Sequence, residues 1–356
     1  MHRAVELAKL GCGFTNPNPL VGAVIVKDGR IIGEGYHKRY GDLHAERDAL
    51  KNCTECVKGA EMYVTLEPCC HRGKQPPCTD AVIESGIKKV YVGSYDPNPL
   101  VSGKSGKLLK AAGIDVTYEV LKEECDELND IFFHYITTQM PYVIMKVAMS
   151  IDGRTASYTG DSRWITNELS RENAHRTRKR VAGIMVGINT VLADNPMLNC
   201  RTQNPSNPVR IICDSHLKIP NESKIMQTAG EIRTIIATVS KDDKKIADIE
   251  KAGAEVIVTE GERVNLIELM KELGARKIDS VLVEGGAELH ASMLENNLVD
   301  KLQIYIAPKI IGGRDAKPAV GGRGVKYVRD AYMFGSPEIS RFGDDILIEY
   351  KKVIAK

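Results

Sequence analysis

The chain has 356 residues, 43% of them hydrophobic and 27% charged, a composition typical of a soluble globular protein and not of a disordered or collagen-like chain. This length exceeds the usual size of one domain, so we expect two domains. The 49 Lys and Arg residues against 47 Asp and Glu residues leave a net charge of only +2. That balance excludes binding of nucleic acid or membrane through an overall positive field, so any phosphate must be bound locally.

The first ten residues interleave charged and apolar side chains, which predicts an amphipathic helix and no secretory signal. No stretch approaches the roughly 18 uncharged apolar residues needed to cross a bilayer. We therefore expect a cytoplasmic protein. In that compartment, cysteines are metal ligands, catalytic groups or small core residues rather than disulfides, and the odd count of 9 agrees with this.

The first third of the chain is predicted to alternate strands and helices, which is typical of a mostly parallel α/β sheet covered by helices. Two apolar runs joined by Lys27-Asp28-Gly29 predict a hairpin, because Asp and Gly accept the positive φ of a tight turn. The predicted elements are strands 20–26 and 30–35, a helix 44–52, a strand 61–66, a helix 79–85 ended by Gly86, a strand 88–95, a helix 104–112 and a strand 114–120.

A helix predicted over 122–138 ends before Pro141, which disfavours helix for the residue before it. We place the domain boundary there, with domains over 1–140 and 141–356. The second domain is predicted to contain strands 142–149, 184–186, 209–212, 234–239, 255–258, 280–284 and 301–307. Two similar Pro-rich loops, 16–21 and 96–101, are either rigid turns or stiff supports for polar side chains around a planar ligand.

The most informative pattern is His44-Ala45-Glu46, followed by Cys69 and then Cys78. One imidazole and two thiolates suit zinc, and three protein ligands leave the fourth position open for water, as in catalytic sites. Glu46 is poorly placed to bind the same ion, since neighbours two apart do not share a helix face, but it can move protons beside the metal. We expect Cys78 at a helix N-terminus, where the dipole lowers the pKa of its thiol.

This order of ligands matches the pattern of zinc deaminases, except that eight residues separate Cys69 from Cys78, so the loop between them must fold back. Two alternatives remain open. The first is a nucleoside or nucleic-acid deaminase with an accessory domain, against which the near-neutral charge counts. The second is a structural zinc site made by Cys53, Cys56, Cys69 and Cys78, which leaves His-Ala-Glu unexplained.

Together these motifs resemble the bifunctional deaminase/reductase family of riboflavin biosynthesis. The spacing from Cys69 to Cys78 distinguishes that family from cytidine and tRNA deaminases. The similar segments are 15–22, 44–46, 66–69, 76–78 and 96–99 in the first domain, and 146–154, 160–166, 190–196 and 283–286 in the second. The resemblance therefore covers nearly the whole chain. Cys70 departs from the family, which commonly has Ser there.

The resemblance implies an α/β chain with an N-terminal cytidine-deaminase-like three-layer domain, followed by a dihydrofolate-reductase-like α/β domain. The first domain would hydrolyse the 2-amino group of 2,5-diamino-6-(5-phosphoribosylamino)pyrimidin-4(3H)-one, with Glu46 as the proton-transfer group. The implied ligands of its one zinc ion are His44, Cys69 and Cys78. The implied substrate contacts in this domain are Asn18, Lys74, Asp96 and Asn98.

The second domain lacks a Gly-x-Gly-x-x-Gly motif after its first strand, so we do not expect a standard dinucleotide fold. The predicted strand 280–284 instead continues into Gly285-Gly286 and a helix, whose N-terminal amides can receive a phosphate. The resemblance implies an NADPH-dependent reductase. It would reduce the ribosyl chain to ribityl and yield 5-amino-6-(5-phosphoribitylamino)uracil.

The implied NADPH contacts are Met149, Trp164, Thr190, Asp194, Ser215, Gly286, Ala287, Glu288, Leu289, His290, Ala291 and Ser292. The implied contacts to the sugar phosphate are Ser162, Arg178, Leu198, Arg201 and Glu284. Arginine suits bidentate recognition of phosphate. The proton donor of the reduction is either Lys146 or Glu284. We expect a small phosphorylated pyrimidine as substrate, no nucleic-acid or membrane partner, and, from the resemblance, a homo-oligomer.

Overall fold

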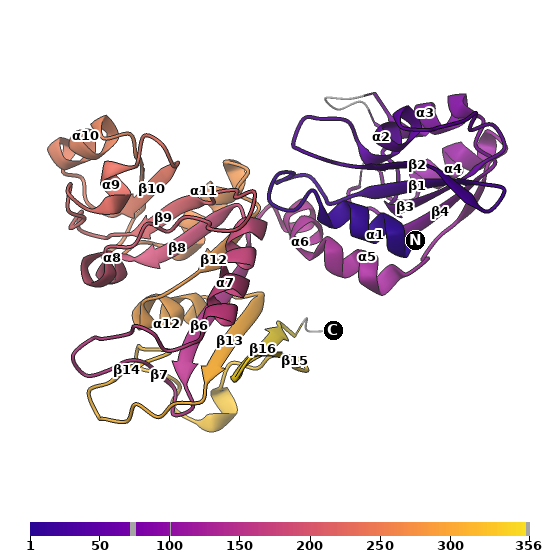
Figure 1. Ribbon diagram of the computed structural model, residues 1–356. Coiled ribbons are helices and arrows are strands. Elements are labelled where there is room, and N and C mark those ends of the chain that lie inside the picture. The colour runs from indigo at the N-terminus through magenta and orange to yellow at the C-terminus, as the bar shows by residue number, and fades with distance from the viewer. Residues whose placement is uncertain (72–75, 100, 354–356) are drawn as a thin grey trace. The chain divides into compact units, whose positions relative to one another are not determined.

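The computed structural model describes residues 1–71, 76–99 and 101–353 (Figure 1). The chain divides into two compact units, Met1–Gln139 and Met140–Lys356. Each unit has its own sheet and its own hydrophobic core. None of the helices formed by the described residues has the length and apolar character needed to cross a membrane.

The sheet of the first unit has five strands in the order β2-β1-β3-β4-β5. Their bounds are β1 Gly22–Lys27, β2 Arg30–Tyr36, β3 Glu61–Leu66, β4 Lys89–Ser94 and β5 Asp115–Thr117. The predicted hairpin is confirmed, with φ of 48° at Asp28 and 76° at Gly29 in its two-residue turn. Only β3, β4 and β5 run parallel, because the hairpin places β1 antiparallel to both β2 and β3.

Helices cover both faces of this sheet and give three layers, as expected. On one face lie α2 Ala45–Lys51, α3 Cys78–Ser85 and α4 Lys104–Ala111, and on the other lie α1 His2–Lys9, α5 Lys122–Leu128 and α6 Asp130–Thr138 (Figure 1). The prediction of one helix over 122–138 was wrong, because the helix breaks at Asn129. The Asn129 side chain accepts from the backbone N–H of Leu20 at 2.8 Å and donates to its carbonyl at 3.0 Å.

The sheet of the second unit has nine strands in the order β11-β10-β9-β8-β12-β6-β13-β16-β15. The bounds are β6 Tyr142–Ser150, β8 Gly183–Gly187, β9 Val209–Cys213, β10 Thr234–Thr238, β11 Glu255–Val258, β12 Ser280–Val283, β13 Lys301–Ala307, β15 Glu338–Phe342 and β16 Asp345–Lys351. All seven predicted strands are confirmed. The sequence did not predict the hairpin β15–β16 or the short pair β7 Arg154–Ala156 and β14 Lys317–Pro318.

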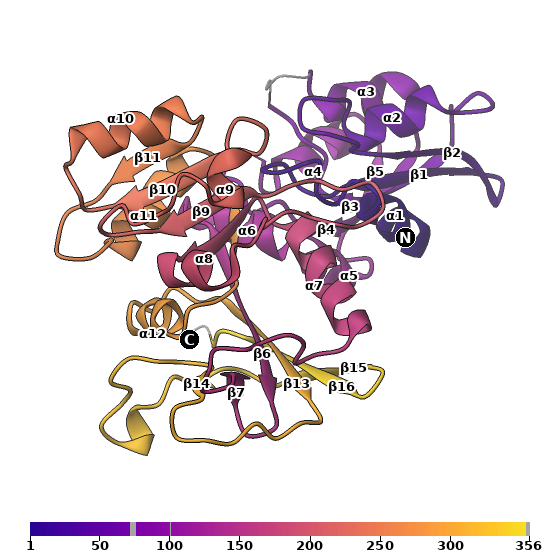
Figure 2. The ribbon, with the colours of Figure 1, turned by 60° about the vertical axis from the view of Figure 1, so that its left-hand side comes forward.

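Two hydrophobic clusters pack against opposite faces of this second sheet. One contains residues of α11 Leu266–Ala275 and α12 Ala287–Glu295, and the other contains residues of α8 Ile188–Asp194, α9 Lys224–Gln227 and α10 Asp243–Lys251. A long helix, α7 Glu168–Arg180, contacts β13 through side-chain hydrogen bonds, and a short 3-10 helix covers Val328–Asp330. Strands β8 and β12 each lead at their carboxyl ends into a helix, α8 and α12. Figure 2 shows these two helices. In open α/β sheets, ligands bind at this edge, at the carboxyl ends of the strands.

Candidate active sites

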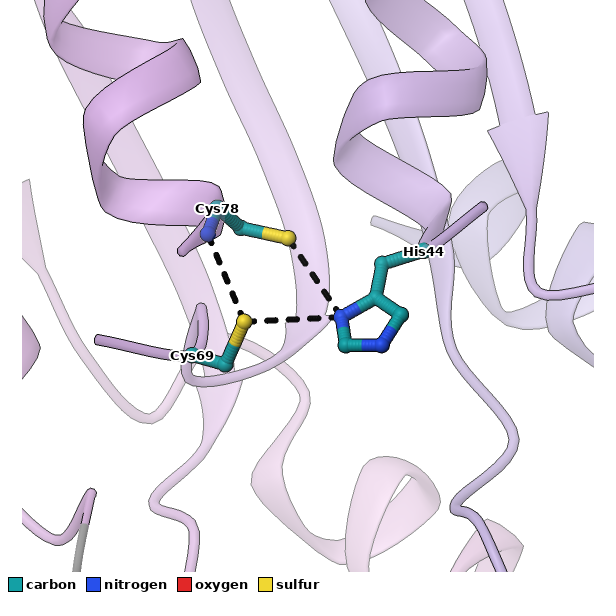
Figure 3. A group of neighbouring side chains, drawn as sticks. All are labelled: His44, Cys69 and Cys78. Atoms are coloured by element: carbon teal, nitrogen blue, oxygen red, sulfur yellow. Dashed lines mark hydrogen bonds between the residues drawn. The ribbon is translucent and has the colours of Figure 1, made fainter. Parts of the chain in front are cut away.

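In the first unit, His44, Cys69 and Cys78 point toward one another (Figure 3). His44 is the N-cap of α2, Cys78 is the first residue of α3, and Cys69 lies in the loop after β3. The His44 Nδ1 atom lies 3.4 Å from the Cys69 sulfur and 3.5 Å from the Cys78 sulfur. A tetrahedral zinc ion bound by one nitrogen and two sulfurs would hold nitrogen and sulfur about 3.6 Å apart. The residues present therefore fit a zinc ion with three protein ligands.

The surroundings of the cluster act differently on the two sulfurs. The hydrogen bond with Cys69 and burial raise the pKa of Cys78, so the prediction of a lowered pKa at this helix N-terminus was wrong. Cys78 is fully buried, and its backbone N–H donates to the Cys69 sulfur at 3.3 Å. Hydrogen bonds from the Cys78 thiol and from His44 lower the pKa of Cys69 to about 4. Thiolate, not thiol, is the form that binds metal, so Cys69 is ready to act as a ligand.

Glu46 lies in the first turn of α2, two residues after the ligand His44, and is only 3% exposed. Burial raises the pKa of Glu46 above the ordinary value, and the nearby Cys69 sulfur raises it further. Glu46 is not a member of the ligand cluster. A buried carboxyl with a raised pKa beside a metal site suits a group that takes and returns protons near neutral pH.

The predicted substrate residue Asn18 is held beside the cluster by a histidine that sequence analysis missed. The amide of Asn18 contacts the His37 Nε2 atom at 3.0 Å, and the other ring nitrogen contacts the carbonyl oxygen of Leu43 at 3.0 Å. The rings of His37 and His44 meet edge to face, with 5.4 Å between centroids. This chain of contacts fixes the orientation of the Asn18 amide. Lys74, also predicted to contact substrate, lies outside the described residues.

A second buried acid shapes the segment that follows β4. The Glu67 carboxylate accepts from the backbone N–H groups of Asp96 and Gly103 at 3.4 and 3.0 Å, and from the Tyr118 hydroxyl at 3.1 Å. Asp96 in turn accepts from the backbone N–H of Asn98 at 2.8 Å, and burial raises the pKa of Asp96 to about 6. Glu67 therefore positions the segment that carries two predicted substrate residues. In the sequence, only the position of Glu67 within the motif Leu-Glu-Pro-Cys indicated a role for it.

The alternative site made of four cysteines is wrong. Within the described part of the chain, the only group of His, Cys, Asp and Glu side chains spaced to hold a metal is His44, Cys69 and Cys78. Cys53 donates its thiol hydrogen to the carbonyl of Ala49, and Cys56 is exposed. Both cysteines therefore lie outside the metal cluster.

The second unit contains a cavity of about 1030 Å³ along the carboxyl ends of β12, β8 and β9, with part of β6 beside them. Fifteen of the predicted residues line it: Lys146, Ser162, Trp164, Arg178, Thr190, Asp194, Arg201, Ser215, Glu284, Gly286, Ala287, Glu288, Leu289, His290 and Ser292. Three do not: Met149, which packs against the core, and Leu198 and Ala291, which are buried.

A cluster of three charged side chains lies in this cavity. Arg178 forms a bidentate ion pair with Glu284, at 2.7 and 2.9 Å, and the Lys146 ammonium lies 3.8 Å from the same carboxylate. Burial alone would raise the pKa of Glu284, but the two cations lower it to about 2. Burial lowers the pKa of Lys146. Glu284 is therefore a carboxylate at neutral pH, and Lys146 is the group in this cluster that can give up a proton.

The start of α12 offers a place for a phosphate. Gly285 and Gly286 have φ of 124° and 86°, a region that favours glycine, and a Cβ added at Gly285 would lie 3.4 Å from the Thr190 hydroxyl. The backbone N–H of Gly285 donates to His290 Nε2 at 3.3 Å, which holds the loop against the helix. A side-chain-free loop before a helix N-terminus fits the pyrophosphate of a dinucleotide.

His175 is a cavity residue that sequence analysis missed. Its Nδ1 atom accepts a hydrogen bond from the backbone N–H of Arg201 at 3.3 Å. Burial and the neighbouring charges of Arg178 and Arg201 lower the pKa of His175 to about 4, so the ring is neutral at physiological pH. His175 therefore positions Arg201, one of the predicted phosphate contacts, without adding charge.

Trp164 is 60% exposed although it lines the cavity. The guanidinium of Arg171 lies 4.5 Å from the centre of its ring, and Lys309 donates to its carbonyl at 2.7 Å. These contacts hold the backbone and one face of the ring. The exposed ring can stack on a planar ligand.

Two family models match the chain. Residues 1–94 match the zinc-binding region of cytidine and deoxycytidylate deaminases, and residues 141–348 match the RibD C-terminal domain. The second match covers more than half of the chain.

Curated relatives and solved structures match the chain along almost its whole length. The riboflavin biosynthesis protein RibD of Actinobacillus pleuropneumoniae is 52% identical, covering 98% of this chain and 94% of its own, and that of Escherichia coli is 39% identical, covering 98% and 97%. A structure of RibD from Acinetobacter baumannii superposes with a TM-score of 0.89 at 35% identity, covering 99% and 98%. A diaminohydroxyphosphoribosylaminopyrimidine deaminase/5-amino-6-(5-phosphoribosylamino)uracil reductase from Thermotoga maritima also gives 0.89, at 38% identity, covering 99% and 97%.

Proposed function

This chain belongs to the RibD family of bifunctional deaminase/reductase enzymes of riboflavin biosynthesis, which use zinc and NADPH, and we propose that its two units perform the two reactions in succession on one phosphorylated pyrimidine. The unit Met1–Gln139 deaminates 2,5-diamino-6-(5-phosphoribosylamino)pyrimidin-4(3H)-one. The unit Met140–Lys356 reduces the product to 5-amino-6-(5-phosphoribitylamino)uracil. The observation that carries the proposal is the cluster of His44, Cys69 and Cys78 beside the buried carboxyl of Glu46.

In the deaminase, His44, Cys69 and Cys78 would hold zinc, which would supply a water of lowered pKa. Glu46 is placed to take the proton that a water loses when it adds to the amino-bearing carbon of the ring. It then delivers protons to the departing nitrogen, which leaves as ammonia while the C–N bond breaks. Asn18 contacts the pyrimidine through an amide whose orientation His37 fixes.

In the reductase, NADPH held in the cavity of the second unit would supply a hydride to C1′ of the ribose. The bond between C1′ and the ring oxygen breaks as C1′ is reduced, so the ring oxygen needs a proton. Lys146 gives its proton to that oxygen, which becomes a hydroxyl of the ribityl chain. Glu284 remains ionised beside Lys146 and keeps the ammonium in place, which the low pKa of Glu284 supports. Arg201 and Ser162 contact the phosphate of the substrate.

The proposal also includes a cytoplasmic location and assembly into a homo-oligomer. No disulfide joins any of the nine cysteines, which supports a reducing compartment. Fractionation of cells and light scattering of the purified chain test these two points separately.

Incubation of the purified, zinc-loaded chain with the diaminopyrimidine phosphate and NADPH tests the two reactions together. Release of ammonia followed by consumption of NADPH is the expected result. Release of ammonia without oxidation of NADPH would contradict the reductase assignment. Absence of both would contradict the whole proposal.

A further inference from the structure

Six cationic side chains line the cavity of the second unit: Lys146, Arg171, Arg178, Arg201, Arg263 and Lys317. Lys146 and Arg178 face the Glu284 carboxylate, and Arg171 stacks on Trp164. Arg263 is exposed and, within the described part of the chain, has no acidic partner within ion-pair distance. Its charge is therefore available to a ligand in the cavity.

The order of the strands indicates which end of the cavity holds each part of the cofactor. Its lining runs from β6 through β12 and β8 to β9, which are neighbours in that order. Under the proposed function, on which this inference rests, the reacting groups Lys146 and Glu284 belong to β6 and the end of β12. The nicotinamide must lie near them. Since Gly285 and Gly286 suit the pyrophosphate, the adenosine half of the cofactor extends toward the end of β9.

At the end of β9, a serine and an arginine are held next to each other. The Ser215 hydroxyl oxygen accepts a hydrogen bond from the backbone N–H of Val264 at 3.2 Å, which brings the segment before α11 against β9. A hydroxyl that accepts in this way still has its own hydrogen to donate. Ser215, Arg263 and Val264 all line the cavity.

We propose that Arg263, together with the Ser215 hydroxyl, binds the 2′-phosphate of NADPH and selects the phosphorylated cofactor over NADH. The two cofactors differ only in that phosphate, at the adenosine ribose. A planar guanidinium matches phosphate oxygens with two parallel hydrogen bonds, and the serine supplies a third donor. In other dinucleotide-binding sites, an arginine also binds the 2′-phosphate of the cofactor.

Binding of cofactor fragments to the full chain tests this without measuring catalysis. Calorimetric titration would compare 2′,5′-ADP, which carries the 2′-phosphate, with 5′-AMP, which lacks it. We expect Arg263→Ala to weaken binding of 2′,5′-ADP about 10-fold to 100-fold and to leave 5′-AMP unchanged. Arg263→Lys should keep part of the preference, because the charge remains while the bidentate geometry is lost.

Two further variants control for charge and for position. Arg233→Ala removes the same charge next to the start of β10, at the opposite end of the strands, and should leave both affinities unchanged. Lys317→Ala removes another cation that lines the cavity, from β14. If Lys317→Ala rather than Arg263→Ala abolishes the preference for 2′,5′-ADP, the assignment to Arg263 is overturned.

The titrations also separate failure of this inference from failure of the proposed function. A wild-type chain that binds NADPH and prefers 2′,5′-ADP, with Arg263→Ala behaving identically, overturns the role of Arg263 alone. A wild-type chain that binds neither NADPH nor 2′,5′-ADP contradicts the reductase assignment and this inference with it. Since Arg263 is exposed, its replacement should leave the thermal unfolding temperature unchanged, which circular dichroism checks.

Discussion

Lys146 and Glu284 form a buried pair of opposite charges whose protonation states differ at neutral pH. Glu284 is 8% exposed and faces two cations, so it keeps its charge far below neutral pH. Lys146 has a lowered pKa because burial disfavours its ammonium, and Arg178 adds repulsion while Glu284 partly opposes the shift. The sequence alone is compatible with either residue as the proton donor. Their environments favour Lys146.

The first prediction concerns the pH dependence of reduction. A donor acts in its protonated form, so the rate should fall as pH rises through the lowered pKa of Lys146. Glu284, with a pKa of about 2, should add no loss of rate on the acid side of neutrality. Oxidation of NADPH with the deaminated intermediate, followed from about pH 6 to about pH 10, measures both. A rate that rises across the alkaline range would contradict the role of Lys146, as would an unaltered profile in Lys146→Met.

The second prediction concerns Glu46. Glu46→Gln keeps the shape of the side chain but removes its ability to carry protons. Ammonia release should fall by a factor of about 1,000 or more, while zinc content and reduction of the deaminated intermediate stay as they are. Metal analysis and the two separate assays measure this. Glu84→Gln, on the exposed surface of α3, is the matched control. Loss of both activities in Glu46→Gln would contradict two independent sites.

Arg210 links three elements of the second sheet. It lies in β9, is fully buried, and donates to the carbonyls of Ile225, Thr228 and Ile232 and to the Thr234 hydroxyl. These contacts join β9 to the segment around α9 and to the start of β10. Burial lowers the pKa of Arg210 to about 10, so it remains charged at neutral pH. The charge is satisfied entirely by neutral oxygen atoms, with no carboxylate paired to it in the described residues.

The third prediction is a loss of stability in Arg210→Met. Methionine fills much of the volume but leaves several carbonyls without donors, so the free energy of unfolding of this unit should fall by about 3 kcal/mol. Urea denaturation measures the change. Arg233→Met, which breaks an exposed ion pair with Glu255 beside β10, should cost less than about 1 kcal/mol. Equal losses in the two variants would show that burial of Arg210 is not the source of the effect.

The two units have separate cores and separate sites, so damage to one site should leave the other working. The fourth prediction is that Cys78→Ser loses zinc and deamination but binds NADPH as tightly as the wild type, because every described residue that lines the cavity of the second unit belongs to that unit. Metal analysis and titration with NADPH of the same preparation test this. Weakened NADPH binding in a variant that retains its thermal stability would contradict the independence of the units.

Much of the fold and of the metal site can be predicted from short patterns in the sequence. Hydrophobic periodicity predicted seven of the nine strands of the second sheet, and Asp28-Gly29 predicted the hairpin of the first. The spacing of His44, Cys69 and Cys78 predicted the group that the structure brings together. Such signals are readable because turn geometry, helix ends and ligand chemistry depend on residues close together in sequence or on rare residue types.

Only the tertiary structure decided which distant side chains meet. Arg178 and Glu284 are separated by 106 positions and Leu20 and Asn129 by 109, and no local pattern marks either pair. The first contact helps to keep Glu284 ionised at neutral pH, and the second lies at the break in a helix that periodicity alone would continue. The sequence by itself therefore determined the elements and the chemistry available, whereas protonation and orientation depended on burial and on charges that exist only once the strands are paired.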